Sequence, residues 1–328
     1  MKPNWSFPAR LSKADGGARR VGVEIEMAGM DIAELADLTG RTLGGQCDRV
    51  SAVEYNVVVP DVGAFRVEVD FAWLKEYARQ NEVNADGGDL TSLAIELLGG
   101  ASTLIVPCEI VTPPIPMRDL PDILDSLVRR LRAAGAKGTR QSMLYAFGVH
   151  LNVEPPDLES DTVVDFLRAF VCLYDWIVDE GQVDVSRQLS PYIRRYDRDY
   201  ELKVANPSYR PAWTTLIDDY LGHNPSRDHA LDMLPLFAHI DEKRVMSVVN
   251  DSLVKSRPAF HYRLANSCID EAGWSIAQPW NLWVRIENLV LEPDALRDCA
   301  VAFGRSRRRM LHSIDKQWVK DVREWLID

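Results

Sequence analysis

The chain has 328 residues, of which 46% are hydrophobic and 27% are charged, and its formal net charge is −11. This length and composition suit one large core or two modest domains. The acidic balance argues against a nucleic-acid surface and against binding to anionic membranes. The sequence contains no apolar run of about 18 residues, so we expect no membrane span.

Cysteine usage indicates a reducing compartment. The five cysteines are scattered and odd in number, and no two of them form a C-x-x-C pair. The first residues lack the apolar core of a signal peptide. We therefore read the thiols as reduced and expect a cytoplasmic protein.

The first part of the chain predicts an arm and a strand. Residues 1–19 are rich in proline and basic residues, which favours an N-terminal arm. Residues 20–28 read as a strand. Because side chains alternate along a strand, Glu24 and Glu26 share one face and the intervening valine and isoleucine residues share the other.

Further strands follow. Residues 51–59 and 64–71 are β-rich and are separated by a proline- and glycine-containing turn, which predicts a hairpin. Residues 72–101 look like an insertion. Residues 103–112 read as another strand, which the two prolines after it bring to an end.

The central part alternates between helix and strand. Apolar residues recur at helical spacing over residues 120–131, and Gly135 closes this helix. Residues 143–153 return to strand. Residues 161–180 have the pattern of an amphipathic helix.

The last part is mainly helical. We expect residues 181–213 to be irregular, 214–222 and 229–251 to be helical, 258–265 to form a last strand and 280–327 to be mostly helical. The strands are too irregularly linked for a doubly wound sheet. The order favours an α+β fold, with a mostly antiparallel sheet covered by helices on one face.

A set of hard ligands lies inside apolar strands. These residues are Glu24, Glu26, Asp70, Glu109 and His150. Burying carboxylates among valine and isoleucine is costly unless a positive charge meets them. The set is rich in oxygen and needs no thiolate, which points to Mg²⁺ or Mn²⁺ rather than to zinc.

Each member of the set also has a structural interpretation. The two glutamates of Glu24-x-Glu26 could lie on an exposed face, and Asp70 could cap a turn. Glu109 could pair with an arginine, and His150 could be a satisfied core histidine. The combination and its order favour the metal interpretation.

At this point the chain resembles the amidoligase family of the glutamate–cysteine ligase and glutamine synthetase superfamily. The motifs that carry the resemblance span roughly residues 20–290. They are Gly22-Val-Glu-Ile-Glu26, Val67-Glu-Val-Asp70, Glu109-Ile-Val-Thr-Pro-Pro114, Gly148-Val-His150 and Phe260-His-Tyr-Arg263.

The resemblance implies a funnel-shaped, glutamine synthetase-like sheet that holds divalent ions between ATP and a carboxylate. It implies a single catalytic domain over residues 20–328, with an insertion around 72–101 and a helical C-terminal part over 280–328. The implied reaction forms an acyl phosphate, which an amine then attacks to give an amide. No Gly-x-Ser-x-Gly elbow, Walker loop or Gly-x-Gly-x-x-Gly motif is present.

The resemblance also implies roles for individual residues. Glu26, Asp70 and Glu109 would hold one Mg²⁺, and Glu24 and His150 would hold the ion that bridges the nucleotide phosphates. Arg263 would meet the phosphoryl group that is transferred, where a fixed guanidinium adds a bidentate clamp. Glu26, Glu109 and Arg263 are thus the predicted catalytic residues.

Two positions depart from the family pattern. Asn152 stands where a second histidine is common, and it could hydrogen-bond a phosphate of the nucleotide. His261 replaces a glutamate two residues before Arg263. As a metal ligand it would remove a negative charge, and either catalysis would be altered or the metal preference would shift toward Mn²⁺. Arg187, in a basic and aromatic stretch, is either a cofactor-side residue of the pocket that could recognise a carboxylate or part of a solvated loop.

The sequence therefore predicts an ATP- and Mg²⁺-dependent carboxylate–amine ligase. A nucleotide- or peptide-binding protein without turnover, and a phosphotransferase on the same scaffold, are the alternatives. The expected partners are a small-molecule or peptide carboxylate and an amine donor. Related ligases often assemble, so a homo-oligomer is one expected state, and an amidotransferase is a candidate supplier of ammonia.

Glu287 is a further carboxylate, on the predicted helix that contains Trp283. We expect it to form a salt bridge with Arg285 or Arg297 rather than to bind a metal. The tryptophans nearby are expected in the core.

Overall fold

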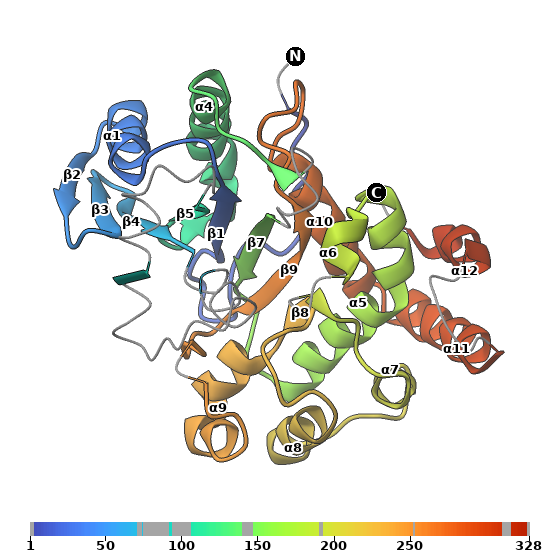
Figure 1. The fold of residues 1–328 in the computed structure, drawn as a ribbon. Coiled ribbons are helices and arrows are strands. Elements are labelled where there is room, and N and C mark those ends of the chain that lie inside the picture. The colour runs from blue at the N-terminus through green and yellow to red at the C-terminus, as the bar shows by residue number, and fades with distance from the viewer. Residues whose placement is uncertain are drawn as a thin grey trace.

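The computed structural model describes residues 3–70, 74, 92–93, 106–139, 147–189, 193–251, 253–309 and 316–326. These residues form an antiparallel sheet with helices packed on one of its faces (Figure 1), which confirms the predicted α+β fold. The nine strands that the structure describes are β1 (Arg20–Met27), β2 (Gln46–Arg49), β3 (Glu54–Val59), β4 (Gly63–Val69), β5 (Cys108–Val111), β6 (Ile115–Pro116), β7 (Gly148–Val153), β8 (Leu231–Asp232) and β9 (Phe260–Asn266).

The first strand of the chain lies in the middle of the sheet. The strand order is β2-β3-β4-β5-β1-β7-β9-β8, and β6 pairs with the start of β1. β1 therefore has β5 on one side and β7 on the other. One irregularity occurs between β7 and β9: Val149 pairs with Ala265 and Leu151 with Tyr262, so β9 has one residue more than β7 over this stretch.

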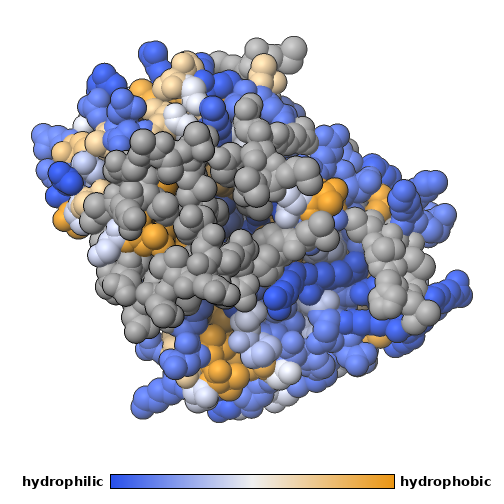
Figure 2. All heavy atoms as spheres, in the orientation of Figure 1, coloured by the Kyte–Doolittle hydropathy of each residue, from blue (hydrophilic) through white to orange (hydrophobic). Residues whose placement is uncertain are grey.

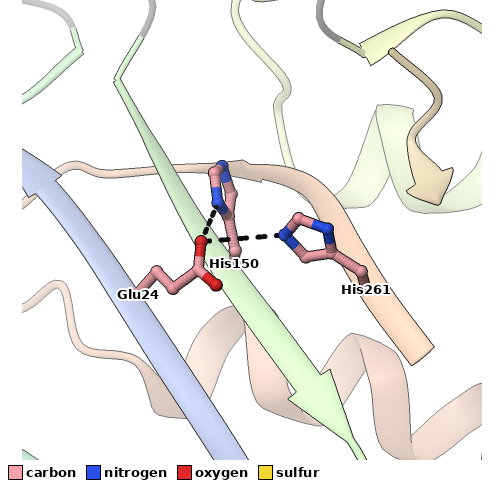
Figure 3. Close-up of side chains that lie close together, drawn as sticks. All are labelled: Glu24, His150 and His261. Atoms are coloured by element: carbon pink, nitrogen blue, oxygen red, sulfur yellow. Dashed lines mark hydrogen bonds and ion pairs between the residues drawn. The ribbon is translucent and has the colours of Figure 1, made fainter. Parts of the chain in front are cut away.

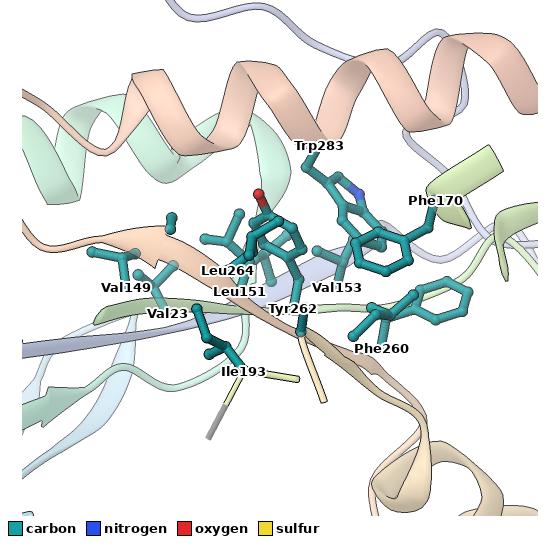
Figure 4. Packing of buried hydrophobic residues seen from close by; sticks show 14 of the residues in the cluster. Val23, Val149, Leu151, Val153, Phe170, Ile193, Phe260, Tyr262, Leu264 and Trp283 are labelled. Carbon is teal, nitrogen blue, oxygen red and sulfur yellow. The ribbon is translucent and has the colours of Figure 1, made fainter. Parts of the chain in front are cut away.

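Alternation of side chains along the strands separates the two faces of the sheet. On β1, Val21, Val23 and Ile25 are fully buried on the helix-covered face, as predicted. The same alternation on β7 and β9 places aliphatic and aromatic residues under helix α10, where Trp283 packs against Phe260 and Tyr262 (Figure 4). The opposite face is left with the polar and charged side chains of the same strands.

The helices are distributed along this buried face and around the edges of the sheet. They are α1 (Ile32–Leu43), α4 (Leu120–Ala133), α5 (Ser160–Glu180), α6 (Val185–Leu189), α7 (Arg198–Val204), α8 (Trp213–His223), α9 (Leu234–Met246), α10 (Ala277–Val290), α11 (Pro293–Arg309) and α12 (Lys316–Asp321), with short 3₁₀ turns η1 (Met117–Asp119) and η4 (Val322–Trp325). Figure 1 shows α1 and α4 beside the β3–β5–β1 half of the sheet and α5 and α10 beside the β7–β9 half.

Helix α5 is the central helix of the second half. Nearly all of its residues from Val163 to Val178 are buried, because α10, α11 and α12 pack around it. A helix that is buried on all sides needs apolar residues on all sides. Its two buried charges are satisfied: Arg168 pairs with Asp165, and Asp175 accepts a hydrogen bond from Arg195.

The segment before β1 is fastened to α4 and α10. Trp5 donates to Asp125 of α4, and Trp280 of α10 donates to the carbonyl oxygen of Ser6. Arg19, fully buried, forms a two-pronged ion pair with Glu287 at 2.7 and 2.9 Å. The predicted partner of Glu287 was therefore wrong, because the arginine comes from a segment far away in sequence.

Most predicted elements occur at the expected places. The strands at 20–28, 51–59, 64–71 and 258–265 correspond to β1, β3, β4 and β9, and the helices at 120–131 and 161–180 correspond to α4 and α5. The sequence analysis missed α1 and β2. α1 begins after an N-cap in which Asp31 accepts from the Ala33 amide, and it ends at Gly44 in the left-handed region.

The predictions for residues 181–213 and 229–251 need correction. The first stretch contains α6 and α7, and the second begins with strand β8 before α9 starts. Short elements of two to seven residues rely on tertiary contacts rather than on their own periodicity. The predicted insertion at 72–101 lies almost entirely outside the described residues.

Exposed hydrophobic residues of the described chain lie at several separate places. Among the coloured residues on the face seen in Figure 2, hydrophilic ones predominate. The larger exposed hydrophobic residues among those described, such as Phe7, Val58 and Val185, come from different elements. Within the described part of the chain, every helix is too short or too polar to cross a lipid bilayer.

Candidate active site

The polar face of the sheet forms the floor of a pocket of about 420 Å³. This volume lies within the usual range of roughly 300–1,000 Å³ for small-molecule sites. The floor comes from β3, β4, β5, β1, β7 and β9, and one wall comes from β8, the start of α9 and residues 253–257. Its acidic lining residues are Glu24, Glu26, Glu54, Glu68, Asp70, Glu109 and Asp232, and its basic ones are Arg66, Arg227, Lys255, Arg257 and Arg263.

Four glutamates form a row across the floor. Glu54 faces Glu68, Glu68 faces Glu109, and Glu109 faces Glu26 on successive antiparallel strands. Side chains directly opposite each other have Cβ atoms about 4.5–5.5 Å apart, and like charges at such positions repel. The ion pair of Glu68 with Arg66 at 2.7 Å offsets part of this repulsion.

A second set of ligand atoms lies next to the row. Glu24 of β1, His150 of β7 and His261 of β9 each offer one atom, and these atoms all lie within 4.8 Å of one another (Figure 3). His150 Nδ1 is 2.7 Å and His261 Nε2 is 3.7 Å from Glu24 Oε2. The pairing of Glu24 with His150 across β1 and β7 brings the first two together.

A carboxylate lies next to the ring nitrogen of His261 that points away from Glu24. Its Nδ1 atom lies 3.3 Å from Asp232 Oδ2, and both side chains are buried. Its Nε2 atom is buried and has no hydrogen-bond partner. The free ring nitrogen of His261 therefore faces Glu24 and the pocket.

Glu26 is surrounded by groups that fix both of its oxygens. The Gly148 amide donates to Oε2 at 2.5 Å, and His150 Nε2 lies 3.2 Å from Oε1. Arg187 Nη1 lies 4.0 Å from Oε2, while Arg187 Nη2 donates to the carbonyl oxygen of Arg263. One buried arginine thus connects the β1 carboxylate to the backbone of β9.

The wall of the pocket beside the sheet carries several cationic side chains. Arg227 precedes β8, and Lys255 and Arg257 lie between α9 and β9. Arg257 lies 3.6 Å from Glu24 Oε1, and Arg263 is 4% exposed with its Nε atom unpartnered. Guanidinium groups at this position can bind phosphate or carboxylate oxygens in a bidentate manner.

Comparison with known proteins places this site in a family. A family model described as "Putative amidoligase enzyme" matches residues 17–285, which is most of the chain and includes all the pocket residues named above. The chain belongs to this amidoligase family. A search of curated proteins found no match. Amidoligases are ligase-type enzymes, and the suspected family is confirmed.

Burial and mutual repulsion raise the pKa values of carboxylates in the acidic row. Burial raises the pKa of Glu26 to about 8, and the neighbouring Asp70 carboxylate adds to the effect. Burial also raises the pKa of Glu109 well above its usual range, together with the charges of Glu24 and Asp70. Raised pKa values of this kind indicate that the site lacks positive charge, and a bound cation would supply that charge.

At the histidine side of the site, the pKa values of His150 and Glu24 are lowered instead of raised. Burial lowers the pKa of His150 to about 3, so its ring is neutral near pH 7. Although burial acts to raise the pKa of Glu24, the adjacent His261 and His150 hold it well below its usual range. A neutral ring and an ionised carboxylate are the states in which these groups bind metals.

Most of the residues that the sequence singled out come together in this pocket. The ones that line it are Glu24, Glu26, Asp70, Glu109, His150, His261 and Arg263. Asn152 and Arg187 are buried but are not among the lining residues: Asn152 donates to Glu24 Oε1 at 2.9 Å, and Arg187 lies behind Glu26. They contact ligand residues instead of facing the pocket.

Sequence reasoning missed part of the pocket. Glu54 and Glu68 lie on strands that were predicted, and their alternation with buried valines could have placed them on the same face as Glu109. The positions of Asp232, Arg227 and Lys255 carried no comparable signal, because they depend on how β8 and the loop before β9 pack against the sheet.

Proposed function

We propose that the protein is an ATP- and divalent-cation-dependent ligase that joins a carboxylate to an amine through an acyl phosphate. The observation that carries the proposal is the division of the pocket into an acidic floor and a cationic wall. Membership of the amidoligase family supports the reaction class. The acids and amines that fit are small molecules or peptides.

The residues present fit divalent cations. Glu26, Asp70 and Glu109 would hold one ion, and Glu24, His150 and His261 would hold another. The raised pKa of Glu26 and the unpartnered Nε2 of His261 both indicate missing positive charge. When bound, such ions offset the charge on phosphoryl oxygens.

The chain's own cations would bind the nucleotide phosphates. Arg263 lies on the floor next to His150, and Arg257, Lys255 and Arg227 lie on the wall above it. In the first step a carboxylate oxygen of the substrate attacks the γ-phosphorus, and the bond to ADP breaks. In the second step the amine nitrogen attacks the acyl carbon, and phosphate leaves. Neither step needs a nucleophile from the protein.

Glu26 and Arg187 would keep this arrangement rigid. The Gly148 amide and His150 fix the Glu26 carboxylate, and Arg187 links it to the β9 backbone at Arg263. Ligand groups that are held in place before the substrate binds lose little free energy to reorganisation.

The test is incubation with ATP, Mg²⁺ or Mn²⁺ and a panel of acids and amines, with detection of ADP, phosphate and the amide by mass spectrometry. We expect ADP formation that depends on an acid and an amide that depends on both substrates. The Arg263→Lys variant should lose at least tenfold in rate, because lysine cannot form a bidentate contact. Glu34→Gln, at an exposed position of α1, serves as the control. Failure to bind nucleotide at millimolar Mg²⁺ and Mn²⁺ would contradict the proposal.

Binding without turnover is a second candidate, and His261 favours it, since a histidine replaces a carboxylate expected from the family pattern. The His261→Glu variant separates the two. A gain of ATP hydrolysis in this variant would indicate a decayed site, and loss of an existing activity would indicate a working one. A phosphorylated product without an amide would indicate phosphotransfer.

The cellular compartment and the partner proteins of the enzyme are also proposed. The five cysteines, all of them in described segments, form no disulfide, which supports a reducing compartment such as the cytoplasm. A homo-oligomer and an ammonia-supplying amidotransferase are the proposed partners, which size-exclusion chromatography and glutamine-dependent activity in the presence of that partner would test.

A further inference from the structure

The buried pair of Asp232 and His261 defines which ring nitrogen of the histidine is available. Asp232 Oδ1 accepts from the Leu234 amide at 2.9 Å, which leaves Oδ2 for His261 Nδ1 at 3.3 Å. A carboxylate only accepts hydrogen bonds, so the Nδ1 atom carries the proton. The Nε2 atom then presents a lone pair toward the pocket.

That lone pair faces another acceptor. His261 Nε2 has no hydrogen-bond partner and lies 3.7 Å from Glu24 Oε2. A carboxylate oxygen and an imidazole lone pair repel each other unless a cation lies between them. His150 lies beside both, with its ring nearly perpendicular to that of His261 and the centroids 5.4 Å apart.

We propose that Asp232 is a positioning residue that fixes the tautomer of His261, so that His261, His150 and Glu24 bind a first-row transition-metal ion such as Mn²⁺ or Co²⁺ in preference to Mg²⁺. Two imidazoles and one carboxylate are donors that suit transition metals, whereas Mg²⁺ takes oxygen ligands. A carboxylate behind a metal-binding histidine is the usual second layer of such sites. The inference rests on the second cation site of the proposed function.

The decisive variant is Asp232→Asn. Its Oδ1 atom can still accept from the Leu234 amide, so the start of α9 is kept. Its second atom becomes an NH₂ group, which donates to His261 Nδ1 and moves the proton of the ring to Nε2. The metal-facing nitrogen would then lack a lone pair, although the volume of the side chain is unchanged.

The experiment is titration of the metal-free protein with Co²⁺ alone, followed by visible absorption, and with Mn²⁺ alone, followed by electron paramagnetic resonance. We expect Co²⁺ bands typical of nitrogen ligands and no displacement by an equal concentration of Mg²⁺. Asp232→Asn should weaken Co²⁺ binding about 10- to 100-fold. His261→Gln should weaken it further and remove one nitrogen donor from the spectrum. Asp228→Asn, in the segment just before β8 but outside the pocket lining, should bind like the parent.

An unchanged Kd and spectrum in Asp232→Asn, or displacement of Co²⁺ by equimolar Mg²⁺, would overturn the inference. Far-UV circular dichroism of the metal-free variants verifies folding, and His261→Gln provides the test if Asp232→Asn does not fold. A protein that binds Co²⁺ as expected but forms no amide would contradict the proposed function and leave this inference standing. If the protein is an active ligase with Mg²⁺ alone and Asp232→Asn binds metal normally, the proposed function would stand and this inference would be contradicted.

Discussion

Glu26 and Glu109 lie directly opposite each other on the neighbouring antiparallel strands β1 and β5. Two carboxylates at such positions repel when both are ionised. Glu68 and Glu54 continue the row on the next strands, so the repulsion accumulates on one side of the pocket. We expect this repulsion to lower the stability of the metal-free protein, and the cation proposed above would relieve it.

Replacing one member of the row should therefore stabilise the metal-free protein. We expect Glu109→Gln to raise the free energy of unfolding by about 1 kcal/mol in the presence of a chelator, because the burial and neighbouring carboxylates that raise the pKa of Glu109 then no longer oppose folding. The same change should abolish most of the stabilisation that Mg²⁺ or Mn²⁺ produces, because a ligand is lost. Thermal melts with and without metal measure both effects. If Glu109→Gln destabilises the metal-free protein, the row is not under electrostatic strain; exposed Glu34→Gln is the matched control.

The stability of the metal-free protein should fall as the pH rises. The pKa of Glu26 is raised from 4.5 to about 8 by burial, with Asp70 adding to the effect and Arg187, the Gly148 amide and Arg263 opposing it. The folded protein therefore binds more protons than the unfolded chain between these values, and the free energy of unfolding decreases as pH increases through that window.

Denaturation by urea at about pH 5 and about pH 8 in a chelator tests this sign. One unit of pKa displacement corresponds to about 1.4 kcal/mol, so we expect a difference of a few kcal/mol. Glu26→Gln should reduce the difference, because this position no longer titrates. Saturating Mn²⁺ should reverse the trend, since metal binding requires the ionised form. If the metal-free protein is more stable at the higher pH, the acidic row does not determine how the free energy of unfolding depends on pH.

Gly148 is expected to tolerate no side chain. A Cβ atom at this position would lie 2.6–2.9 Å from the guanidinium of buried Arg187. Gly148→Ala should therefore displace Arg187 from Glu26 and from the Arg263 carbonyl, with a stability loss of about 1–3 kcal/mol and a rate loss on the order of 100-fold. Chemical denaturation and ADP formation measure the two effects. Gly222→Ala on α8 is the control, since nothing lies within 4 Å of the added atom; equal effects at the two glycines would contradict the account.

The buried ion pair between Arg19 and Glu287 should contribute to stability without a role in the reaction. Glu287 also accepts a hydrogen bond from Trp283 at 2.9 Å. Glu287→Gln leaves the fully buried Arg19 charge unpaired, which should cost about 3 kcal/mol. Metal affinity at temperatures where the variant is folded should equal that of the parent. The exposed Glu292→Gln is the matched control in the same denaturation series, and a loss below about 1 kcal/mol in Glu287→Gln would show that the pair is replaceable.

The floor of the pocket could be predicted because it obeys a local rule. Alternation along β1 placed Glu24 and Glu26 on one face and the valines on the other, and the same rule applies to Glu109 and His150. The strands in which these residues lie are long enough and apolar enough to be recognised from the sequence.

The wall of the pocket could not be predicted, because no local pattern encodes it. Asp232 belongs to a strand of two residues, which is too short for a recognisable pattern and is defined by its pairing with β9. The partner of Glu287 was missed for a similar reason: Arg19 lies in a segment that has no regular structure, and only tertiary packing buries it.

The extra residue of β9 has a consequence for how this strand can change. His261 faces the pocket and pairs with Asn152, and Asn266 pairs with Gly148, although an odd number of positions separates the two on β9. Arg263 and Leu264 together oppose His150. Because of this extra residue, the alternation of side chains between the two faces shifts by one position after Leu264. Deleting Leu264 would convert this irregularity into regular pairing, so Ala265 and Asn266 would keep their partners on β7 and their faces of the sheet. A deletion in a regularly paired part of the strand would instead turn the later side chains over, so β9 should tolerate a change in length best at this point.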